Sequence, residues 1–100
     1  MTDSDDEDDS RLAGQEQRHR EREQRDTDDI RQVMSTDAGR RVIWWLLERG
    51  KVFSTTFHAD PHIAAFNEGQ RNLALAMFSR VMAASPDNYL LMAAEASKEE

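Results

Sequence analysis

Two histidines and one aspartate lie within five residues of one another, at His58, Asp60 and His62. Two imidazoles and a carboxylate are ligands that suit zinc or a similar ion, so these residues are the candidate metal centre of an enzyme. Pro61 stiffens the segment, however, and no fourth ligand is evident. An Asp directly before a Pro is also the usual start of a helix, with the Asp at the N-cap. We therefore expect no metal and no cofactor, and interpret Asp60 as a helix cap.

A pair of adjacent tryptophans, Trp44 and Trp45, is the second candidate. Neighbouring residues of a helix point about 100° apart, so both indoles rarely enter one small core. Packing in the core would account for either tryptophan ring considered alone. Because tryptophan is enriched in interface hot spots, we expect the other ring to cover a neighbouring helix, the N-terminal arm or a partner.

A polar segment in a predicted long helix is the third candidate. A glycine in mid-helix costs about 1 kcal/mol relative to alanine, and close approach of another helix, through Trp44 or Trp45, would justify Gly69. Glu68 can pair with Arg71 or Asn72 one turn away. We interpret the segment as a seam that fixes helix register, formed by Asn67, Glu68, Gly69, Arg71 and Asn72.

Other catalytic arrangements are missing from the sequence. It has no Gly-rich phosphate-binding loop, and no Ser or Thr with a convincing His and acid nearby. A general acid–base pair needs a cleft, for which so short a chain offers little room. Arg40-Arg41 is the one doubled basic step after residue 37, and we interpret it as the solvated start of a helix. We predict that the protein is not an enzyme.

The net charge of the chain is confined to its first third. Residues 1–37 hold 13 Asp and Glu against six Lys and Arg, whereas residues 38–100 hold seven of each, so the first segment carries the whole net charge of −7. Residues 1–10 are too acidic and too poor in apolar side chains to repay the entropy of ordering. Their acids are Asp3, Asp5, Asp6, Glu7, Asp8 and Asp9. We predict an acidic disordered tail at 1–10, a charged helical arm at 11–37 and a small helical module at 38–100.

Composition also limits the partners. An acidic chain does not bind duplex DNA through phosphate neutralisation, so we expect no direct duplex binding. Acidic arms bind basic surfaces or imitate a phosphate backbone; the alternative is a tail that only keeps the chain soluble. A module of about 60 residues is marginally stable, and with no Cys for disulfides we expect a homo-oligomer or an assembly-bound protein.

No secretion signal is visible, because the N-terminus is acidic rather than basic. The longest apolar run, residues 42–47, is far shorter than the roughly 20 residues of a membrane span. We expect a soluble intracellular chain with no membrane span.

The arm has the composition of a polar helix. Glu16 and Arg20 have the favourable i,i+4 order, but the segment lacks an apolar face. We expect it to be helical when assembled and partly helical when free. Residues 27–29 resemble a helix start and predict a separate short helix at 28–35.

Three further helices are predicted. They run from residue 37 or 38 to Arg49 with Gly50 as the C′ residue, from Asp60-Pro61 to about Ala84, and from residue 87 to about 97. The long middle helix carries two apolar stripes, one of Phe66, Leu73, Met77 and Val81 and one begun by Leu75, Phe78 and Met82. The predicted fold is all-α, a small bundle of three to four short helices with a long acidic or polar N-terminal arm that is helical or disordered.

Several short segments occur in a recognisable order between about residues 28 and 95. They are Gly39-Arg40-Arg41-Val42, Leu46-Leu47-Glu48, Val52-Phe53 with Thr56-Phe57, Phe66-Asn67-Glu68-Gly69-Gln70-Arg71-Asn72, and Pro86 with Tyr89 to Met92. In this order the chain resembles a small domain family of tailed bacteriophages, the Bbp-type family labelled from a Bordetella phage. The resemblance implies a phage origin among genes that build the particle. It carries no assigned active site, and the acidic arm lies outside it.

The first functional hypothesis is a non-enzymatic phage structural or assembly protein. It would be a virion component, scaffold-like or internal and ejected, located in the host cytoplasm during assembly and then in the virion. Its partners would be other phage structural proteins, namely the portal, capsid or internal core, with the arm on a basic surface. The predicted partner-binding residues are Trp44, Trp45, Leu75, Phe78 and Met82.

The alternative hypothesis is a host-directed binder whose acidic arm mimics nucleic acid and occupies a basic groove. Such a complex would be strongly salt-dependent. A third possibility is the enzyme that would use His58, Asp60 and His62 with a metal ion.

Overall fold

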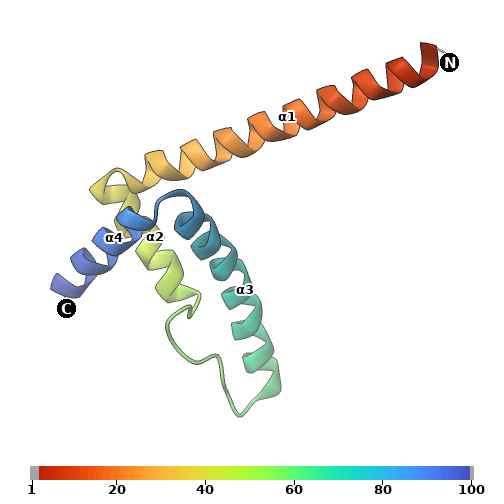
Figure 1. Cartoon of the computed structure of the whole chain (residues 1–100). Coiled ribbons are helices and arrows are strands. Elements are labelled where there is room, and N and C mark those ends of the chain that lie inside the picture. Colours follow the sequence, from red (N-terminus) through yellow and green to blue (C-terminus); the bar gives the residue numbers. More distant parts are fainter. Residues whose placement is uncertain (1–2, 100) are drawn as a thin grey trace.

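A computed structural model describes residues 3–99 of the chain, with side chains from Asp5 onward. The described residues form four helices and no strand: α1 (Asp3–Met34), α2 (Asp37–Arg49), α3 (Pro61–Ala84) and α4 (Pro86–Lys98) (Figure 1). The predicted all-α helical bundle is confirmed.

The starts of the last three helices follow from local chemistry. Thr36 is the N-cap of α2, and its Oγ1 accepts a hydrogen bond of 2.9 Å from the Gly39 backbone N–H. Asp60 caps α3 by accepting from the His62 N–H at 2.8 Å, and Pro61 occupies the first helical position. Pro86 opens α4 in the same way, although the Ser85 side chain makes no capping bond. The predicted positions of these three helices are confirmed.

The N-terminal helix is continuous, and the prediction of a separate short helix at residues 28–35 is wrong. Asp28 does not cap a new start; its carboxylate accepts from Gln24 at 3.0 Å and lies 3.6 Å from Arg31. These partners lie one turn before and one turn after it, so Asp28 stabilises the interior of a helix. Disorder of residues 1–10 in the free chain stays a prediction; residues 3–10 are helical here, and Met1 and Thr2 lie outside the described residues.

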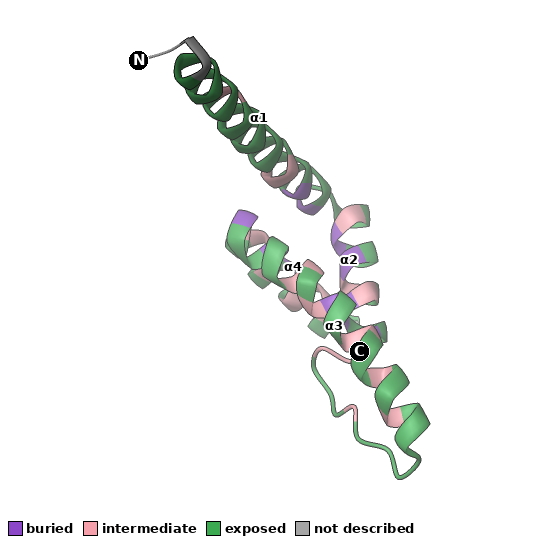
Figure 2. Cartoon of the chain, turned by 90° about the vertical axis from the view of Figure 1, so that its right-hand side faces the viewer, coloured by how far each residue is buried: buried purple, intermediate pink, exposed green. Residues whose placement is uncertain are grey.

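The core is small, and each helix contributes one large, fully buried side chain to it. These are Met34 from α1, Leu47 from α2, Val81 from α3 and Met92 from α4, joined by Ile30, Ile43 and Ala84. Figure 2 shows buried positions on the last turns of α1 and along the helices of the bundle, while nearly all of the rest of α1 is exposed. The last turns of α1, within the segment we defined as the arm, therefore belong to the bundle.

Two glycines allow backbones to approach closely. A Cβ on Gly50 would collide with the Cβ of Ala74 on α3, and one on Gly39 would collide with the Val33 carbonyl oxygen. Gly50 ends α2 as predicted, but its φ is −80°, and the residue with positive φ is Lys51, at 60°. Gly50 therefore serves helix packing rather than a left-handed turn.

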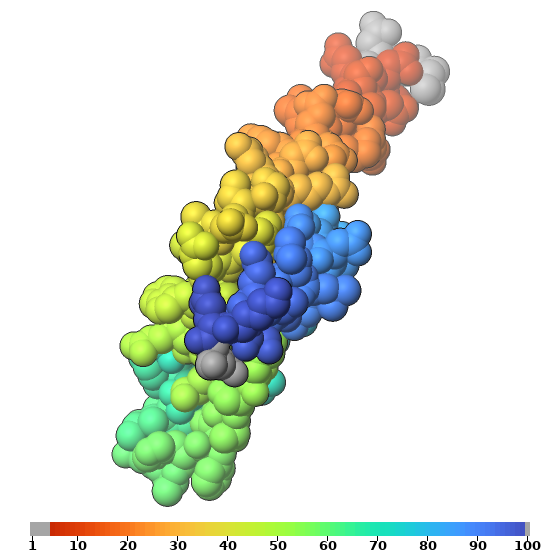
Figure 3. Space-filling model, turned by 90° about the vertical axis from the view of Figure 1, so that its left-hand side faces the viewer, coloured from red at the N-terminus to blue at the C-terminus, as the bar shows by residue number. Residues whose placement is uncertain are grey.

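The molecule is elongated because most of α1 leaves the bundle. Its radius of gyration is 19.7 Å, against about 13 Å for a compact chain of 100 residues. Its principal extents are 66 × 37 × 15 Å. In Figure 3 the arm projects at one end, while α4 lies across the bundle face that contains α2.

Candidate docking site

The two tryptophans of α2 take different environments. Trp44 is half-buried, and its ring stacks on Phe53 with centroids 5.0 Å apart and planes 23° apart. Phe53 meets the edge of Phe78 at 6.4 Å, and Phe78 meets the edge of Tyr89 at 5.4 Å. Of the predicted partner-binding residues, Trp44 and Phe78 thus already pack within the chain.

Trp45, in contrast, is 62% exposed on the outer face of α2. It shares a shallow hollow of about 330 Å³ with Ala38, Arg41 and Val42, and Val42 is itself 63% exposed. The outer face of α2 is therefore apolar and uncovered by the described part of the chain. A partner role for Trp45 stays a prediction.

The two apolar stripes predicted for α3 do not coincide with its buried face. Val81 is buried, but Phe66 is 65% and Leu73 71% exposed, because α3 presents Ala74, Val81 and Ala84 to the core. In the second stripe Leu75 is half-buried and Met82 is 39% exposed. Leu75 and Met82 stay predicted docking residues.

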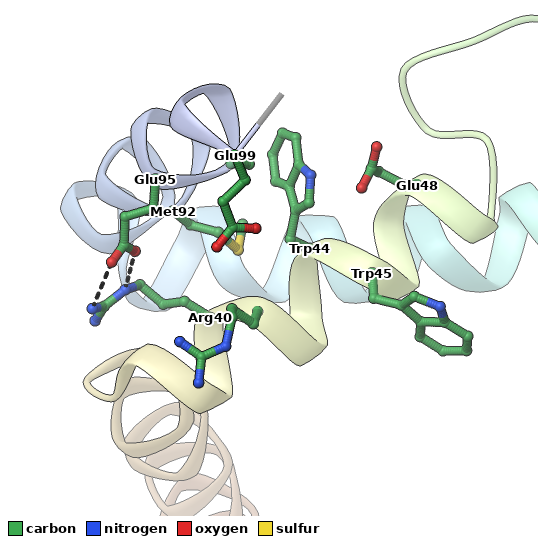
Figure 4. Close-up of a pocket in the computed structure, with 9 residues that line it drawn as sticks. Arg40, Trp44, Trp45, Glu48, Met92, Glu95 and Glu99 are labelled. Carbon is green, nitrogen blue, oxygen red and sulfur yellow. Dashed lines mark hydrogen bonds and ion pairs between the residues drawn. The ribbon is translucent and has the colours of Figure 1, made fainter.

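A shallow pocket of about 190 Å³ opens between α2 and α4 (Figure 4). Its lining includes Arg40, Trp44 and Glu48 from α2, and Met92, Glu95 and Glu99 from α4. Met92 is fully buried and the Trp44 ring stacks on Phe53, so the apolar part of the pocket is already formed within the chain.

The polar side of this pocket is built around Arg40, which sequence analysis placed in a solvated helix start. That interpretation is wrong for Arg40, because the residue is only 7% exposed. Its guanidinium donates to Glu95 Oε1 at 2.6 Å, to Asp37 Oδ1 at 2.5 Å and to the Met34 carbonyl at 2.9 Å. Buried charges are retained when they are paired and hydrogen-bonded in this way.

Arg40 and Glu95 each shift the pKa of the other. The hydrogen bond with Glu95 raises the pKa of Arg40 above its ordinary value, and the bond from Arg40 lowers the pKa of Glu95. Asp37, three residues before Arg40, was a sequence signal for an ion pair, but nothing in the sequence indicated Glu95, 55 residues away.

The predicted polar seam lies near the loop rather than near α2. Glu68 accepts from the Thr56 hydroxyl, and Asn67 donates to the Thr56 carbonyl at 3.4 Å. The predicted pairing of Glu68 with Arg71 or Asn72 is therefore wrong. A Cβ on Gly69 would meet nothing within 4 Å, so the predicted approach of Trp44 or Trp45 is wrong too.

Arg71 is half-buried, and its Nε lies buried without a hydrogen-bond partner among the described residues. Asn72 is exposed, without a side-chain hydrogen bond in the described part of the chain. The two residues therefore lie on the same helix without forming a network with Glu68. The role of this segment in fixing helix register stays a prediction.

In the histidine segment, the side chains of His58 and Asp60 accept hydrogen bonds from the backbone at the start of α3. His58 Nδ1 accepts from the Asp60 N–H at 2.9 Å, and Asp60 accepts from the His62 N–H. Among residues 3–99, no group of three His, Cys, Asp or Glu side chains is arranged to hold a metal ion. The structure thus assigns Asp60 to the start of α3.

The acidic arm is exposed along nearly its whole free length. From Asp5 to Arg25 every side chain is exposed except Gly14, which has none. Asp5, Asp6, Glu7, Asp8 and Asp9 all face solvent, with Asp8 paired to Arg11 at 2.7 Å, while only the backbone of Asp3 is described. The acidic end of α1 is therefore presented away from the bundle.

None of the described helices is long and apolar enough to cross a membrane. Residues 30–94 match the profile of a family described as Bbp19-like phage protein. The matched segment begins at Ile30, the first buried residue of α1, and leaves out the exposed arm. No curated protein and no solved structure gives a significant match to the chain.

Proposed function

The chain belongs to the family of Bbp19-like phage proteins, and from that premise we propose that it is a non-enzymatic structural or assembly component of the phage particle. Its bundle docks through the outer face of α2, and its arm lies on a basic surface of the portal, capsid or internal core. The supporting observation is the separation of charge from core: the arm projects uncovered, while Trp45 and Val42 stand exposed on the bundle.

The two surfaces would act together. An exposed acidic helix gains little from any one ion pair in water, and a small apolar face gains little alone. Tethering them in one chain makes the second contact intramolecular, which raises the overall affinity well above that of either one. The small core, in a chain without Cys, favours a homo-oligomeric or assembly-bound protein.

The test is incorporation into particles, measured by mass spectrometry as copy number relative to the portal. Replacing Trp45 with Ala should lower incorporation, since an interface hot spot contributes about 2 kcal/mol or more, close to 30-fold in affinity. Leu90→Ala on α4 is the matched control, because Leu90 is similarly exposed, at 66%, but lies on another helix. Equal incorporation of both variants would contradict docking through α2.

The arm is tested separately by deleting residues 1–25. The remaining chain would begin with Asp26 and Thr27, keep all buried residues and retain its apolar docking face. Incorporation should fall and should become less sensitive to salt. An unchanged yield in particles would show that the arm takes no part.

A second candidate function is host-directed binding, in which the arm mimics nucleic acid. The observation that favours it is the run of exposed carboxylates at residues 5–9 on a straight helix. Such a protein would be absent from particles and would form a salt-sensitive complex with a host DNA- or RNA-binding protein. Recovery of virion proteins alone from infected cells would eliminate this function.

A further inference from the structure

The pocket between α2 and α4 has the chemistry to receive a cation. Three carboxylates line it, from Glu48, Glu95 and Glu99, together with the guanidiniums of Arg40 and Arg41. Arg40 shares its charge with both Glu95 and Asp37, so it does not compensate the remaining acids. Arg41 is the other cation of the lining, and neither Glu48 nor Glu99 forms an ion pair within residues 3–99. The pocket is therefore net acidic.

The apolar part of the pocket lies next to these charges. In Figure 4 the Trp44 ring stands between the side chains of Glu99 and Glu48, and Met92 forms the inner wall. Its volume of about 190 Å³ is below the roughly 300–1,000 Å³ of small-molecule sites. Space of this size suits one amino-acid side chain better than a metabolite.

We propose that this pocket receives a single basic side chain, arginine or lysine, presented by the docking partner. The aliphatic stem would lie against Trp44 and Met92, and the cationic group would lie near Trp44 and the carboxylates of Glu48 and Glu99. A cation over a tryptophan ring gains about 0.5–1 kcal/mol at an exposed site, and long basic side chains cover apolar surface with their stems. This inference rests on the proposed docking function and specifies one contact of it.

Contacts already made within the chain support this assignment. Trp44 is held by its stack on Phe53, and Glu95 is held by Arg40, so two walls of the pocket are in place before a partner arrives. A preformed site loses less conformational entropy on binding than one that must be ordered.

The test uses the full-length ¹⁵N-labelled protein and the probe N-acetyl-L-arginine amide, followed by NMR. Saturable shifts are expected at the Trp44 indole N–H and at the backbone amides of Met92 and Ala96. N-acetyl-L-citrulline amide, which has the same shape without the charge, should produce much smaller shifts. The double variant Glu48→Gln/Glu99→Gln should weaken binding about fivefold.

The matched control is Glu7→Gln/Glu16→Gln, which removes the same charge from exposed positions on the arm. It should leave the affinity at Trp44 unchanged. Equal shifts with the citrulline probe, shifts that follow the arm carboxylates, or an unaltered affinity of the pocket variant would each overturn the inference.

The outcome is distinguishable from that of the docking proposal. If the probe fails to bind but Trp45→Ala still lowers incorporation into particles, the docking function stands and the pocket has no basic occupant. If the probe binds while the Trp45 variant is incorporated normally, the pocket is a real cation site and docking through the outer face of α2 is wrong.

Discussion

Arg40 of α2 and Glu95 of α4 form an ion pair across the bundle, with 2.6 Å between Nε and Oε1. The Arg40 side chain is only 8% exposed, whereas the Glu95 side chain is 37% exposed. Since α4 follows α3 rather than α2 in the chain, this pair ties together helices that no short loop connects. The bond to the Met34 carbonyl extends the same guanidinium to the end of α1.

The first prediction is loss of stability in acid. Arg40 lowers the pKa of Glu95 below its ordinary value of 4.5, so between the two values the unfolded chain binds more protons than the folded one. The stabilisation is therefore complete above about pH 4.5 and is lost as the pH falls through the folded-state pKa. Urea unfolding from pH 7 to pH 3 should show this decline in the wild type.

Glu95→Gln isolates the effect, because the other carboxylates titrate in both proteins. The difference in unfolding free energy between wild type and variant should be largest near neutral pH and should shrink toward pH 3. A difference that stays constant with pH would mean that the Glu95 charge does not stabilise the fold.

The second prediction concerns the core. Leu47 is fully buried, so Leu47→Ala should lower the unfolding free energy by about 2–5 kcal/mol. Leu73→Ala is the matched control, because Leu73 is 71% exposed and should lose no more than about 0.5 kcal/mol. Chemical denaturation measures both, and similar losses would contradict the burial of Leu47 in the core.

The third prediction contrasts two glycines. Gly50→Ala places a methyl group against Ala74, and forcing such a contact costs about 1–3 kcal/mol. Gly69→Ala meets open space in a helix interior and should stabilise the protein by about 0.5–1 kcal/mol. Thermal unfolding should move in opposite directions for the two variants; a loss of stability at both positions would refute the account of Gly69.

Local signals predicted most of the helices correctly, and the wrong predictions of charge pairing share one cause. Thr36, Asp60 and Pro86 act on their own neighbours, so the helix starts were visible in the sequence. The partners of Arg40 and Glu68 depend on segments brought together only by folding. Sequence alone cannot choose among competing partners for a charge: it left Arg40 in solvent and paired Glu68 with nearby Arg71 or Asn72.

The candidate site shows the same limit. The divergence of Trp44 and Trp45 followed from the 100° step of a helix, and the structure has one ring half-buried and the other exposed. The pattern of α3 was misleading because its core face carries two alanines, Ala74 and Ala84, which a search for large apolar residues passes over. The pocket was missed because α2 and α4 are distant in sequence.

The fourth prediction separates the arm from the bundle. Residues 5–25 are exposed, so deleting residues 1–25 should change the unfolding free energy of the rest by no more than about 0.5 kcal/mol. Deleting residues 1–34 also removes Ile30 and Met34, which are 8% and 0% exposed, and leaves the other three helices without part of their core. Each such loss costs about 2–5 kcal/mol, which is comparable to the whole stability of a small domain, so this longer deletion should not fold. Circular dichroism with urea titration distinguishes the two: the first deletion should keep a cooperative transition at the wild-type midpoint, and the second should show none. A large shift on removing residues 1–25 would mean that the exposed part of α1 supports the bundle, and the arm would then be unavailable as an independent binding element.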